Sequence, residues 1–436
     1  MKTIINFIKK LLRKPKHIHQ VGDLNNIIPG AQHSISKADI STNALNVLTR
    51  LHQAGFQAYL VGGGVRDLLL SKAPKDFDVS TDATPQQIRR LFRNARIIGR
   101  RFKLAHILYH REIIEVSTFR GHAPVDVNQQ TNEHGMLIRD NVYGTLEDDA
   151  WRRDFTVNAL YYCEHDESII DLTGGLADVS SGLLRMIGDP AKRYQEDPVR
   201  MLRAVRFCAK LGFKLTPETA EPITILNNLI LHVSGSRLFD EMIKLYQSGH
   251  ALRVQELLVE YGLFAHLFSQ AAELATKYPV YELLNLTLES TDTRVQADKP
   301  VTPAFIYAAL LWFPVLFQME SLKSEGLDPL PALEQAMSDV IMQQNKIVSI
   351  PKRYTQIIRE IWLLQFRLHK RTGNRAYQLL AHPRFRAAYD FLALRALVDP
   401  QSIPLADWWT KFQDVGEEQQ VKMVKDLGRK LKKDAP

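Results

Sequence analysis

The fold of this chain is decided by the stretch Ala58-Tyr59-Leu60-Val61-Gly62-Gly63-Gly64-Val65-Arg66-Asp67. Its first four residues are apolar and predict a strand, and a helix is expected directly after the glycines, from Val65 to Leu70. A strand, a glycine turn and a helix in this order expose backbone amides, which bind phosphate groups. We therefore expect Gly62 and Gly63 to let the phosphates of a nucleotide approach the backbone, with Arg66 as a further phosphate ligand. The alternative is a glycine turn needed only for packing.

One helix length after the glycines stands Lys75-Asp76-Phe77-Asp78-Val79-Ser80-Thr81, which reads as a second strand. On a strand, Asp76 and Asp78 project from the same face, while Phe77 points the other way into the core. Two neighbouring carboxylates repel each other unless a cation lies between them, and Mg²⁺ prefers such oxygen ligands. We therefore expect Asp76 and Asp78 to be catalytic residues that hold two Mg²⁺ ions, with Mn²⁺ as an alternative. Such ions activate a hydroxyl nucleophile and neutralise a departing pyrophosphate.

A third catalytic carboxylate is expected, and the sequence offers both Glu115 and Asp154, the latter within the run Arg152 to Ala159. A charged residue in the apolar run around Glu115 lies either on the open face of a sheet or in a site. Asp154 would steer a ribose, a metal or Arg153, unless it forms a salt bridge inside its own motif. The sequence does not rank the two. Arg153 and Asn158 are expected to contact the nucleotide.

Composition bounds the class of protein. The formal charge is +8 and the sequence pI is about 9.2, so polyanions such as nucleic acid or anionic lipid are the natural partners. The two cysteines, Cys163 and Cys208, stand in apolar settings and support neither a disulfide scaffold nor a thiolate zinc site. The longest apolar stretch, Ala304 to Phe317, is interrupted by Pro314 and is shorter than the roughly 18 to 20 residues of a membrane span.

The order of structural patterns along the chain predicts an α/β head followed by helical regions. From about Ala44 to Tyr162 short β-rich runs alternate with helical ones, whereas nearly everything after Asp197 has helical periodicity. We divide the chain into a basic leader at 1–40, a head with a mixed sheet at 41–165, a helical neck at 166–250, a helical body and leg at 251–420 and a basic tail at 421–436.

Individual elements follow from the same patterns. In the head, a helix is expected over Pro85 to Phe92, a hairpin over Leu104 to Phe119, and a polar, strandless loop covering the site from Gly121 to Gly135. Further helices are expected at 197–211, 236–247, 251–261, 303–317, 332–345, 353–371 and 384–397.

The N-terminal segment has two equally weighted interpretations. Its apolar residues, Ile4, Ile5, Phe7, Ile8, Leu11 and Leu12, fall on one helical face beside lysine and arginine residues, as in an interfacial membrane helix. A basic docking or disordered leader fits as well. No cleavage site of a secretory signal follows, so a cytoplasmic protein is expected, with a peripheral position at the inner membrane as the variant in which this segment makes weak membrane contact.

Four motifs in order resemble one known family. They are Gly62 to Asp67, the Asp76 and Asp78 pair, Arg152 to Ala159, and Glu196-Asp197-Pro198-Val199-Arg200-Met201-Leu202-Arg203-Ala204-Val205-Arg206-Phe207. Together they resemble the class II transfer-RNA nucleotidyltransferase and bacterial poly(A) polymerase family. The resemblance implies a polymerase-beta-like head, helical neck, body and leg regions, and nucleotide addition without a template.

The last of these motifs implies how the incoming base is read. In the family this segment recognises the base, which maps onto Glu196, Asp197 and Arg200 here. A carboxylate can accept from an exocyclic amine and a guanidinium can donate to a ring nitrogen, so side chains can replace a template base. Arg203 and Arg206 follow on roughly the same helical face and are expected to reach the phosphates or the ribose. A solvated basic face is the alternative.

A further segment separates the members of the family. The run from Ile97 to Ile107 resembles the segment that marks bacterial poly(A) polymerases, and Ile113 to Arg120 continues the match. The expected function is therefore the addition of AMP residues from ATP to RNA 3′ ends, which promotes RNA turnover. The alternatives are a CCA-adding transfer-RNA nucleotidyltransferase and a non-catalytic RNA-binding protein on the same fold.

The helical remainder carries many basic residues, which are expected to contact RNA phosphates. The candidate RNA-binding residues are Lys352, Arg353, Arg367, Lys370, Arg371, Arg429 and Lys430. Interspersed aromatic residues could stack on unpaired bases. At helical spacing, however, Trp362 and Phe385 are expected to belong to the core.

Overall fold

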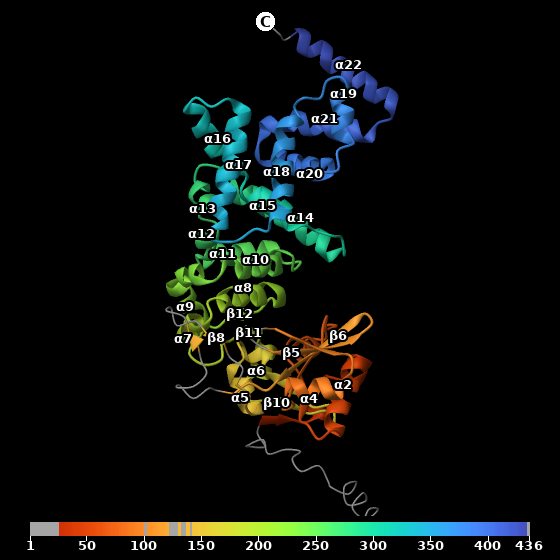
Figure 1. Cartoon of the computed structure of the whole chain (residues 1–436), viewed down its shortest axis with the longest axis vertical. Helices are drawn as coiled ribbons and strands as arrows, with labels where there is room; N and C mark the ends of the chain where they lie inside the picture. The colour runs from red at the N-terminus through yellow and green to blue at the C-terminus, as the bar shows by residue number, and fades with distance from the viewer. Residues whose placement is uncertain (1–25, 100–102, 122–129, 132–136, 140–141, 434–436) are drawn as a thin grey trace, which may run out of the picture. The chain divides into compact units, whose positions relative to one another are not determined.

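The computed structural model describes residues 26–99, 103–121, 130–131, 137–139 and 142–433 (Figure 1). The chain divides into two compact units. The head unit comprises the residues up to Arg200 together with Leu211–Ile223, and the helical unit comprises Met201–Lys210 together with the residues from Thr224 onward.

The head unit is built on an eight-stranded sheet with the order β1-β10-β9-β2-β3-β6-β5-β4. Its strands are β1 (Ile27–Ile28), β2 (Ala58–Val61), β3 (Asp78–Thr81), β4 (Ala95–Ile98), β5 (Leu104–Tyr109), β6 (Glu112–Thr118), β9 (Leu160–Tyr162) and β10 (Ile169–Asp171). Only β3 and β6 pair in parallel; the other neighbours within this described sheet are antiparallel. The predicted mixed sheet and the hairpin of β5 and β6 are confirmed.

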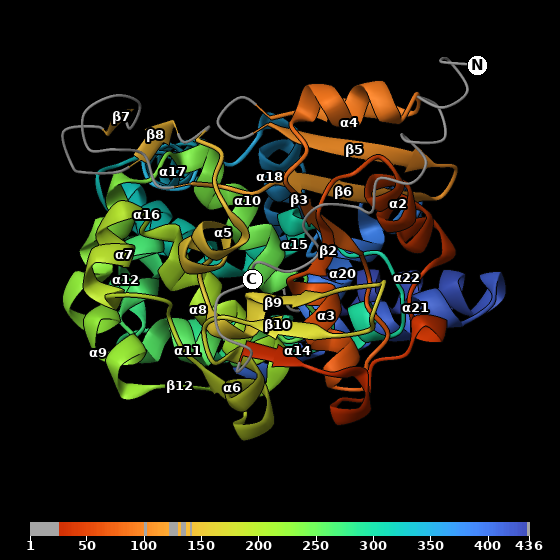
Figure 2. The ribbon, with the colours of Figure 1, turned by 90° about the horizontal axis from the view of Figure 1, so that it is seen from below.

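Short helices and turns complete the head unit. They are α2 (Thr42–Gln53), α3 (Gly63–Leu69), α4 (Pro85–Leu91), α5 (Leu146–Arg152), α6 (Gly175–Ser181), α7 (Pro190–Glu196) and the 3-10 turns η2 (Gly30–Gln32), η3 (Lys37–Asp39) and η4 (Thr156–Asn158). Figure 2 shows α4 lying along β5, and α2 packs against β2, β3 and β6. One buried hydrophobic cluster of the head contains Tyr59, Val61, Phe119 and Tyr161.

The structure corrects several predicted boundaries in the head. β3 begins at Asp78 and not at Lys75, because β2 ends opposite it: Val61 pairs with Asp78, and the chain then turns into the glycines. Since β2 ends at Val61 and the chain turns at Gly62, α3 begins at Gly63 and not at Val65. The sheet also extends beyond the predicted range 41–165, since β1 and β10 belong to it.

The stretch predicted to be a strandless loop contains one short strand. β7 (Gln130–Thr131) lies within it and pairs antiparallel with β8 (Leu137–Arg139), which follows the predicted stretch. The prediction of a loop without strands is therefore wrong for these residues. Residues 122–129 and 132–136 lie outside the described part of the chain.

The helix predicted over 197–211 begins later, and a separate helix precedes it. α7 ends at Glu196 and α8 (Val199–Leu211) begins at Val199, so Asp197 and Pro198 lie between them. Asp197 is extended, with φ −152° and ψ 93°, as expected for a residue before proline. After α8 come β12 (Lys214–Leu215), which pairs with β11 (Leu183–Leu184), and α9 (Pro217–Leu226).

The helical unit has no strand among its described residues. Its elements after α9 are η5 (Asn227–His232), α10 (Gly235–Tyr246), α11 (Ala251–Glu260), α12 (Leu263–Leu267), α13 (Ser269–Leu274), α14 (Val280–Gln296), α15 (Pro303–Leu310), α16 (Trp312–Ser324), α17 (Pro329–Asn345), α18 (Lys352–Arg367), α19 (Asn374–Leu380), α20 (Phe385–Val398), η6 (Pro400–Ser402), α21 (Ile403–Asp414) and α22 (Glu417–Lys433).

The helix predicted over 303–317 is broken at Leu311 into α15 and α16, which are bent by 47°. Pro314 stands in the first turn of α16, where its missing N–H cannot bond back to Leu310. Among the described residues, no single helix combines the length and apolar composition of a membrane span; α15 and α16 reach that threshold only as this bent pair.

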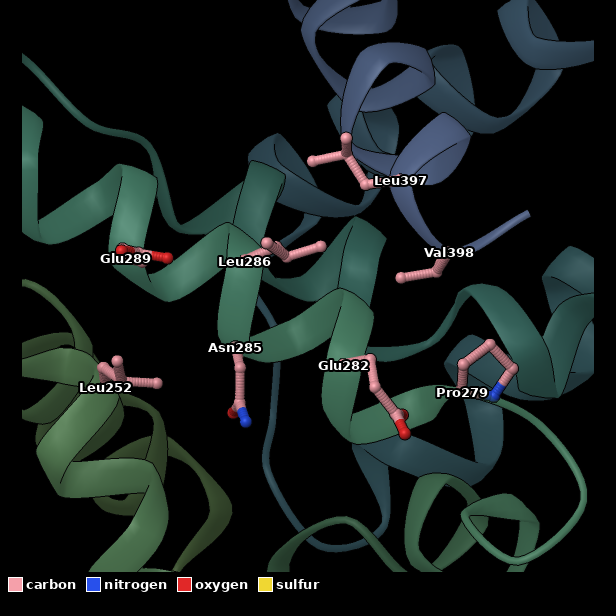
Figure 3. A pocket seen from close by; sticks show the side chains of 8 residues that line it. All are labelled: Leu252, Pro279, Glu282, Asn285, Leu286, Glu289, Leu397 and Val398. Carbon is pink, nitrogen blue, oxygen red and sulfur yellow. The ribbon is translucent and has the colours of Figure 1, made fainter. Parts of the chain in front are cut away.

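The predicted core aromatic residues are confirmed. Trp362 is fully buried and its indole N–H donates to the Ala308 carbonyl at 2.9 Å, and Phe385 is buried against Trp409. The same unit carries an open groove of about 470 Å³ between α11, α14 and α20. Figure 3 shows Glu282, Leu286 and Glu289 on one helix of that groove. None of the predicted site residues lines it.

Candidate active site

The glycine turn and the acidic loop are packed against each other. Gly62 has φ +75° and ψ −133°, a conformation that residues with a Cβ rarely adopt. At Gly64, an added Cβ would lie 3.4 Å from the Asp76 carbonyl oxygen and 3.5 Å from the Phe77 ring. Phe77 is buried, as predicted, whereas Asp76 is exposed. The glycines thus let the end of β2 approach the segment that carries both aspartates.

Arg66 lies beneath this turn and is only 2% exposed. Its Nη1 donates to the Asn158 side-chain oxygen at 2.6 Å, and its Nε and Nη2 donate to the Asp67 carboxylate at 2.9 and 2.6 Å. Asn158 in turn donates to Asp154 at 3.1 Å. These hydrogen bonds link α3 to η4, so the contacts favour a structural role for Arg66 and Asn158. Their direct contact with a nucleotide stays a prediction.

Three side chains stand in one row across the sheet. The parallel register places Asp78 of β3 opposite Glu115 of β6, and the antiparallel register places Glu115 opposite His106 of β5. His106 Nε2 lies 3.1 Å from a Glu115 carboxylate oxygen. Burial raises the pKa of Asp78 to about 6, and the negative charge of Glu115 adds to the rise while Arg153 opposes it. The central strands β3 and β6 therefore bring two carboxylates together in this row.

The two candidates for the third carboxylate are used differently. Glu115 is the register partner of Asp78. Asp154 accepts from the Phe155 backbone N–H at 2.9 Å and from Asn158, and so stabilises the turn that follows it. The geometry favours Glu115 beside the aspartate pair.

The donor set suits a divalent cation. Among the residues that the structure describes, no group of three or more His, Cys, Asp or Glu side chains is arranged as a metal-binding cluster. Mg²⁺ is commonly held through one or two carboxylates with substrate phosphates and water as its other ligands, and Asp76 and Asp78 offer two. The like charges that raise the pKa of Asp78 are those that a bound cation would neutralise.

A buried carboxylate that the sequence analysis missed holds Arg153 in place. Asp149, on α5, is 4% exposed and accepts from Arg153 Nη2 at 2.9 Å, from the Tyr161 hydroxyl at 2.7 Å and from Ser80 at 3.2 Å. Burial acts to raise the pKa of Asp149, but Arg153 and these hydrogen bonds lower it below its ordinary value. An added Cβ at Gly62 would lie 3.7 Å from Arg153 Nη1, so this guanidinium borders the glycine turn. The i,i+4 spacing of Asp149 and Arg153 was the signal for this pair.

The segment predicted to read the base forms a second charged cluster, at the end of α7 and the start of α8. A single Glu196 carboxylate oxygen accepts from Arg200 at 2.9 Å and from Arg193 at 3.0 Å. Asp197 accepts from the Val199 backbone N–H at 3.3 Å through its side chain. Glu196 and Arg200 are thus brought together as predicted, and Arg193 is an addition that the sequence analysis missed.

Comparison with known proteins decides the family. The family described as "Poly A polymerase head domain" matches residues 58–185, "Probable RNA and SrmB- binding site of polymerase A" matches 212–274, and "Polymerase A arginine-rich C-terminus" matches 325–435. The chain is 47% identical over 437 aligned positions to poly(A) polymerase I of Escherichia coli O6:H1, covering 97% of this chain and 94% of that protein. It is 46% identical to poly(A) polymerase I of Haemophilus influenzae, covering 93% and 91%.

The chain belongs to the poly(A) polymerase I family.

Relatives outside the poly(A) polymerases match a smaller part or at lower identity. The CCA-adding enzyme of Bacillus subtilis is 38% identical over 224 positions, which cover 51% of this chain and 55% of that protein. The crystal structure of the Bacillus stearothermophilus CCA-adding enzyme in complex with CTP has a TM-score of 0.58 at 26% identity, covering 84% of this chain and 80% of that one. These neighbours confirm the predicted fold of a nucleotidyltransferase head followed by helical regions.

The other predicted ligands of this poly(A) polymerase relative lie in the helical unit. On α8, the guanidinium groups of Arg203 and Arg206 stand over the Phe207 ring, at 5.2 and 4.9 Å from its centroid. Lys352, Arg353, Arg367 and Lys370 are exposed. This exposure is what contact with RNA phosphates requires.

Three further basic candidates complete the set. Arg371 is half-buried, its guanidinium lies 5.2 Å from the centroid of the Trp408 ring, and burial lowers its pKa. Arg429 is 80% exposed and lies 3.6 Å from Asp426. The side chain of Lys430, like the N-terminal segment with Ile4 and Phe7, lies outside the described residues.

Proposed function

We propose that this chain adds AMP residues from ATP to RNA 3′ ends without a template. The observation that carries the proposal is the row of Asp78 and Glu115 on the central strands β3 and β6 near the glycine turn, in a chain whose full-length relatives are named poly(A) polymerases. Two anionic side chains fixed in register, with Asp76 next to them, provide a site for metal-assisted attack by a hydroxyl group.

Each group has a defined role in this proposal. Asp76 and Asp78 hold the divalent metal, proposed to be two Mg²⁺ ions with Mn²⁺ as a substitute; when bound, these ions stabilise the charge that develops during phosphoryl transfer. The amides at Gly62 and Gly63 and the guanidinium of Arg153 face the nucleotide. Glu115 acts as the third carboxylate and accepts the proton of the attacking RNA 3′-hydroxyl, with His106 holding its orientation.

The base is selected by side chains of the neck region. Glu196, Asp197 and Arg200 present hydrogen-bonding groups in the place of a template base. The shared contact of Arg200 with Glu196 at 2.9 Å fixes the direction of the guanidinium and limits which base edge it matches.

RNA is held by the basic residues of the helical unit, through its phosphates and without regard to sequence. The exposed members of the set are Lys352, Arg353, Arg367, Lys370 and Arg429, with Arg371 and Lys430 as further contacts. The matches to an RNA-binding region and to an arginine-rich C-terminus support this role.

The CCA-adding function is the second candidate, supported by the partial match to CCA-adding enzymes and by the likeness to one of them in complex with CTP. An extension assay on a generic RNA 3′ end, with Mg²⁺ and each nucleoside triphosphate supplied separately, distinguishes the two. Long tails from ATP alone are expected. Addition limited to CTP and ATP on transfer RNA would establish the CCA-adding function instead.

The same assay assigns the carboxylates. Asp76→Asn and Asp78→Asn are expected to lower the rate at least about a thousandfold, because each removes a metal ligand that stabilises the transition state by several kcal/mol. Glu115→Gln is expected to cost more than Asp154→Asn. The exposed Asp407→Asn, in the helical unit, is the matched control and should leave the rate unchanged. Normal tailing by Asp78→Asn would refute the proposed site.

Cytoplasmic location, with weak membrane contact through the N-terminal segment, completes the proposal. Replacing Ile4 and Phe7 by Asp would remove the apolar face of that segment. A shift of the full chain from the membrane fraction to the soluble fraction is expected, and an unchanged distribution would exclude membrane contact.

A further inference from the structure

Arg193 joins two parts of the site that are distant in the sequence. Its Nη2 donates to the backbone carbonyls of Arg152 and Arg153, both at 2.6 Å. Its Nη1 donates to the Glu196 carboxylate at 3.0 Å, and the Arg193 carbonyl accepts from Arg200 at 2.8 Å. One side chain therefore contacts both the segment that carries Arg153 and the pair of Glu196 and Arg200.

The contacts are specific to a guanidinium group. A planar fork with several N–H donors can satisfy two adjacent carbonyls and a carboxylate at once, whereas a lysine ammonium is a compact point charge without that fixed geometry. The two carbonyls follow each other at the end of α5, where Arg153 is held by Asp149. Through Arg193, the pair of Glu196 and Arg200 is therefore linked to the end of α5, the segment that also carries the Arg153 guanidinium beside the glycine turn.

Arg193 also contributes to folding. Arg193 and Arg200 share the Glu196 carboxylate, Arg152 lies close enough to influence them, and burial with this like charge lowers the pKa of Arg193. The Nε–H group of Arg193 is buried without a hydrogen-bond partner among the described residues. Removing Arg193 would leave the carbonyls of Arg152 and Arg153 and the Glu196 carboxylate without this donor, which destabilises a folded protein. A test of its role in selectivity therefore compares variants at a temperature where each of them is folded.

We propose that Arg193 is a positioning residue that fixes the Glu196 and Arg200 pair relative to Arg153 and thereby sets the selectivity for the base of the incoming nucleotide. This inference rests on the proposed function, because it takes Glu196 and Arg200 to face that base. Arg193 itself need not touch the substrate. Its loss would let the pair shift while the metal-binding aspartates and the glycine turn stay in place.

The test measures selectivity for each nucleotide. Arg193→Gln and Arg193→Lys are compared with the wild type in single-nucleotide addition to one RNA primer, with kcat and KM determined for ATP, CTP, GTP and UTP. The ratio of kcat/KM for ATP to that for CTP is expected to fall at least about tenfold in both variants, which corresponds to about 1.4 kcal/mol of lost discrimination. The loss should come mainly from a higher KM for ATP. Lysine should not restore the ratio.

The neighbouring Lys192→Gln is the matched control. Lys192 is 78% exposed on its side chain and its ion pair is with Asp189 at 3.9 Å, so no change in the ratio is expected. Thermal unfolding of all variants is measured alongside, since Arg193→Gln is expected to unfold at a lower temperature than the wild type, and the ratios are compared where every variant is folded. A double variant with Glu196→Gln should lose no more selectivity than the larger single loss, since both changes break one arrangement.

The outcomes separate the inference from the function on which it rests. An unchanged ATP to CTP ratio in Arg193→Gln, or an equal loss for all four nucleotides, would overturn the inference while polyadenylation by the wild type still stands. A wild type that extends no RNA with ATP would remove the proposed function and the inference with it. A fallen ratio in a variant that is folded at the assay temperature supports the inference.

Discussion

The head unit and the helical unit place charged side chains in opposite ways. In the head, the buried Asp149 holds the half-buried Arg153, and Asp78 is the register partner of Glu115 on the neighbouring strand. In the helical unit, basic residues such as Lys352 and Lys370 are exposed and separate. Charged side chains that hydrogen bonds hold in one direction can fix a nucleotide in one orientation. Solvated charged side chains attract a polyanion in many orientations. Substitutions in the head should therefore have large and specific effects, and those in the helical unit small and general ones.

The largest effect on stability is expected for Asp149→Asn. The amide would leave the half-buried guanidinium of Arg153 without its counterion and would weaken the hydrogen bonds that the buried carboxylate accepts, which costs about 2–3 kcal/mol of the free energy of unfolding. Poly(A) synthesis should fall as well, because Arg153 loses its fixed position at the glycine turn. Urea unfolding at pH 7 together with the extension assay measures both. Glu147→Gln, on the same helix, is the control.

The acid dependence of this effect has a definite sign. Because the pKa of Asp149 is lowered in the folded protein, its contribution is complete above the ordinary carboxyl value of about 3.9 and is lost as the pH falls through the lowered folded value. The stability difference between wild type and Asp149→Asn should narrow below about pH 4. A difference that stays constant down to pH 3 would contradict the assignment of the buried charge.

A smaller effect of opposite sign is expected where Asp78 lies opposite Glu115. The pKa of Asp78 is raised to about 6, so the metal-free protein carries an unfavourable charge there at neutral pH. Asp78→Asn should raise the free energy of unfolding in EDTA at pH 7 by about 1–2 kcal/mol, while it abolishes activity. The gain should appear as the pH rises from about 4 to 6, where only the folded wild type keeps the proton. Asp407→Asn should show no gain, and a destabilised Asp78→Asn would contradict the repulsion.

The same contrast explains which features the sequence could predict. The glycine turn and the pair of Asp76 and Asp78 are local, so their spacing was sufficient to identify them. The approach of Glu115 to Asp78 depends on the parallel register of β3 and β6, which a strand pattern does not fix. For that reason Glu115 and Asp154 could not be ranked before the structure.

Other features were outside the reach of local patterns. Arg66 follows the glycines as a phosphate ligand would, and only the fold shows that its side chain is 2% exposed. The helix predicted from Asp197 begins at Val199, because proline restricts the residue before it to an extended conformation. Arg193 lies in α7, which was not predicted, and its partners are backbone carbonyls 40 and 41 residues away that no side-chain pattern reveals.

The smallest effects are expected for the exposed basic residues. Replacing Lys352, Arg353 or Lys370 singly by Gln should weaken RNA binding about two- to threefold at physiological salt, because each residue contributes one screened contact to a phosphate. Binding of a fluorescent single-stranded RNA, measured over a range of salt concentrations, should show a salt slope shallower by about 0.7 for each contact removed.

The selectivity for ATP over CTP provides the contrast with the head. It should remain that of the wild type in these three variants, since charges that attract the phosphate backbone do not orient the incoming base. The exposed Lys299→Gln serves as the control for a general change in net charge. Lys352→Gln could instead lower the ratio of kcat/KM for ATP to that for CTP as strongly as Arg193→Gln does. That result would contradict the contrast between the two units, because the helical unit would then have to act on the nucleotide itself.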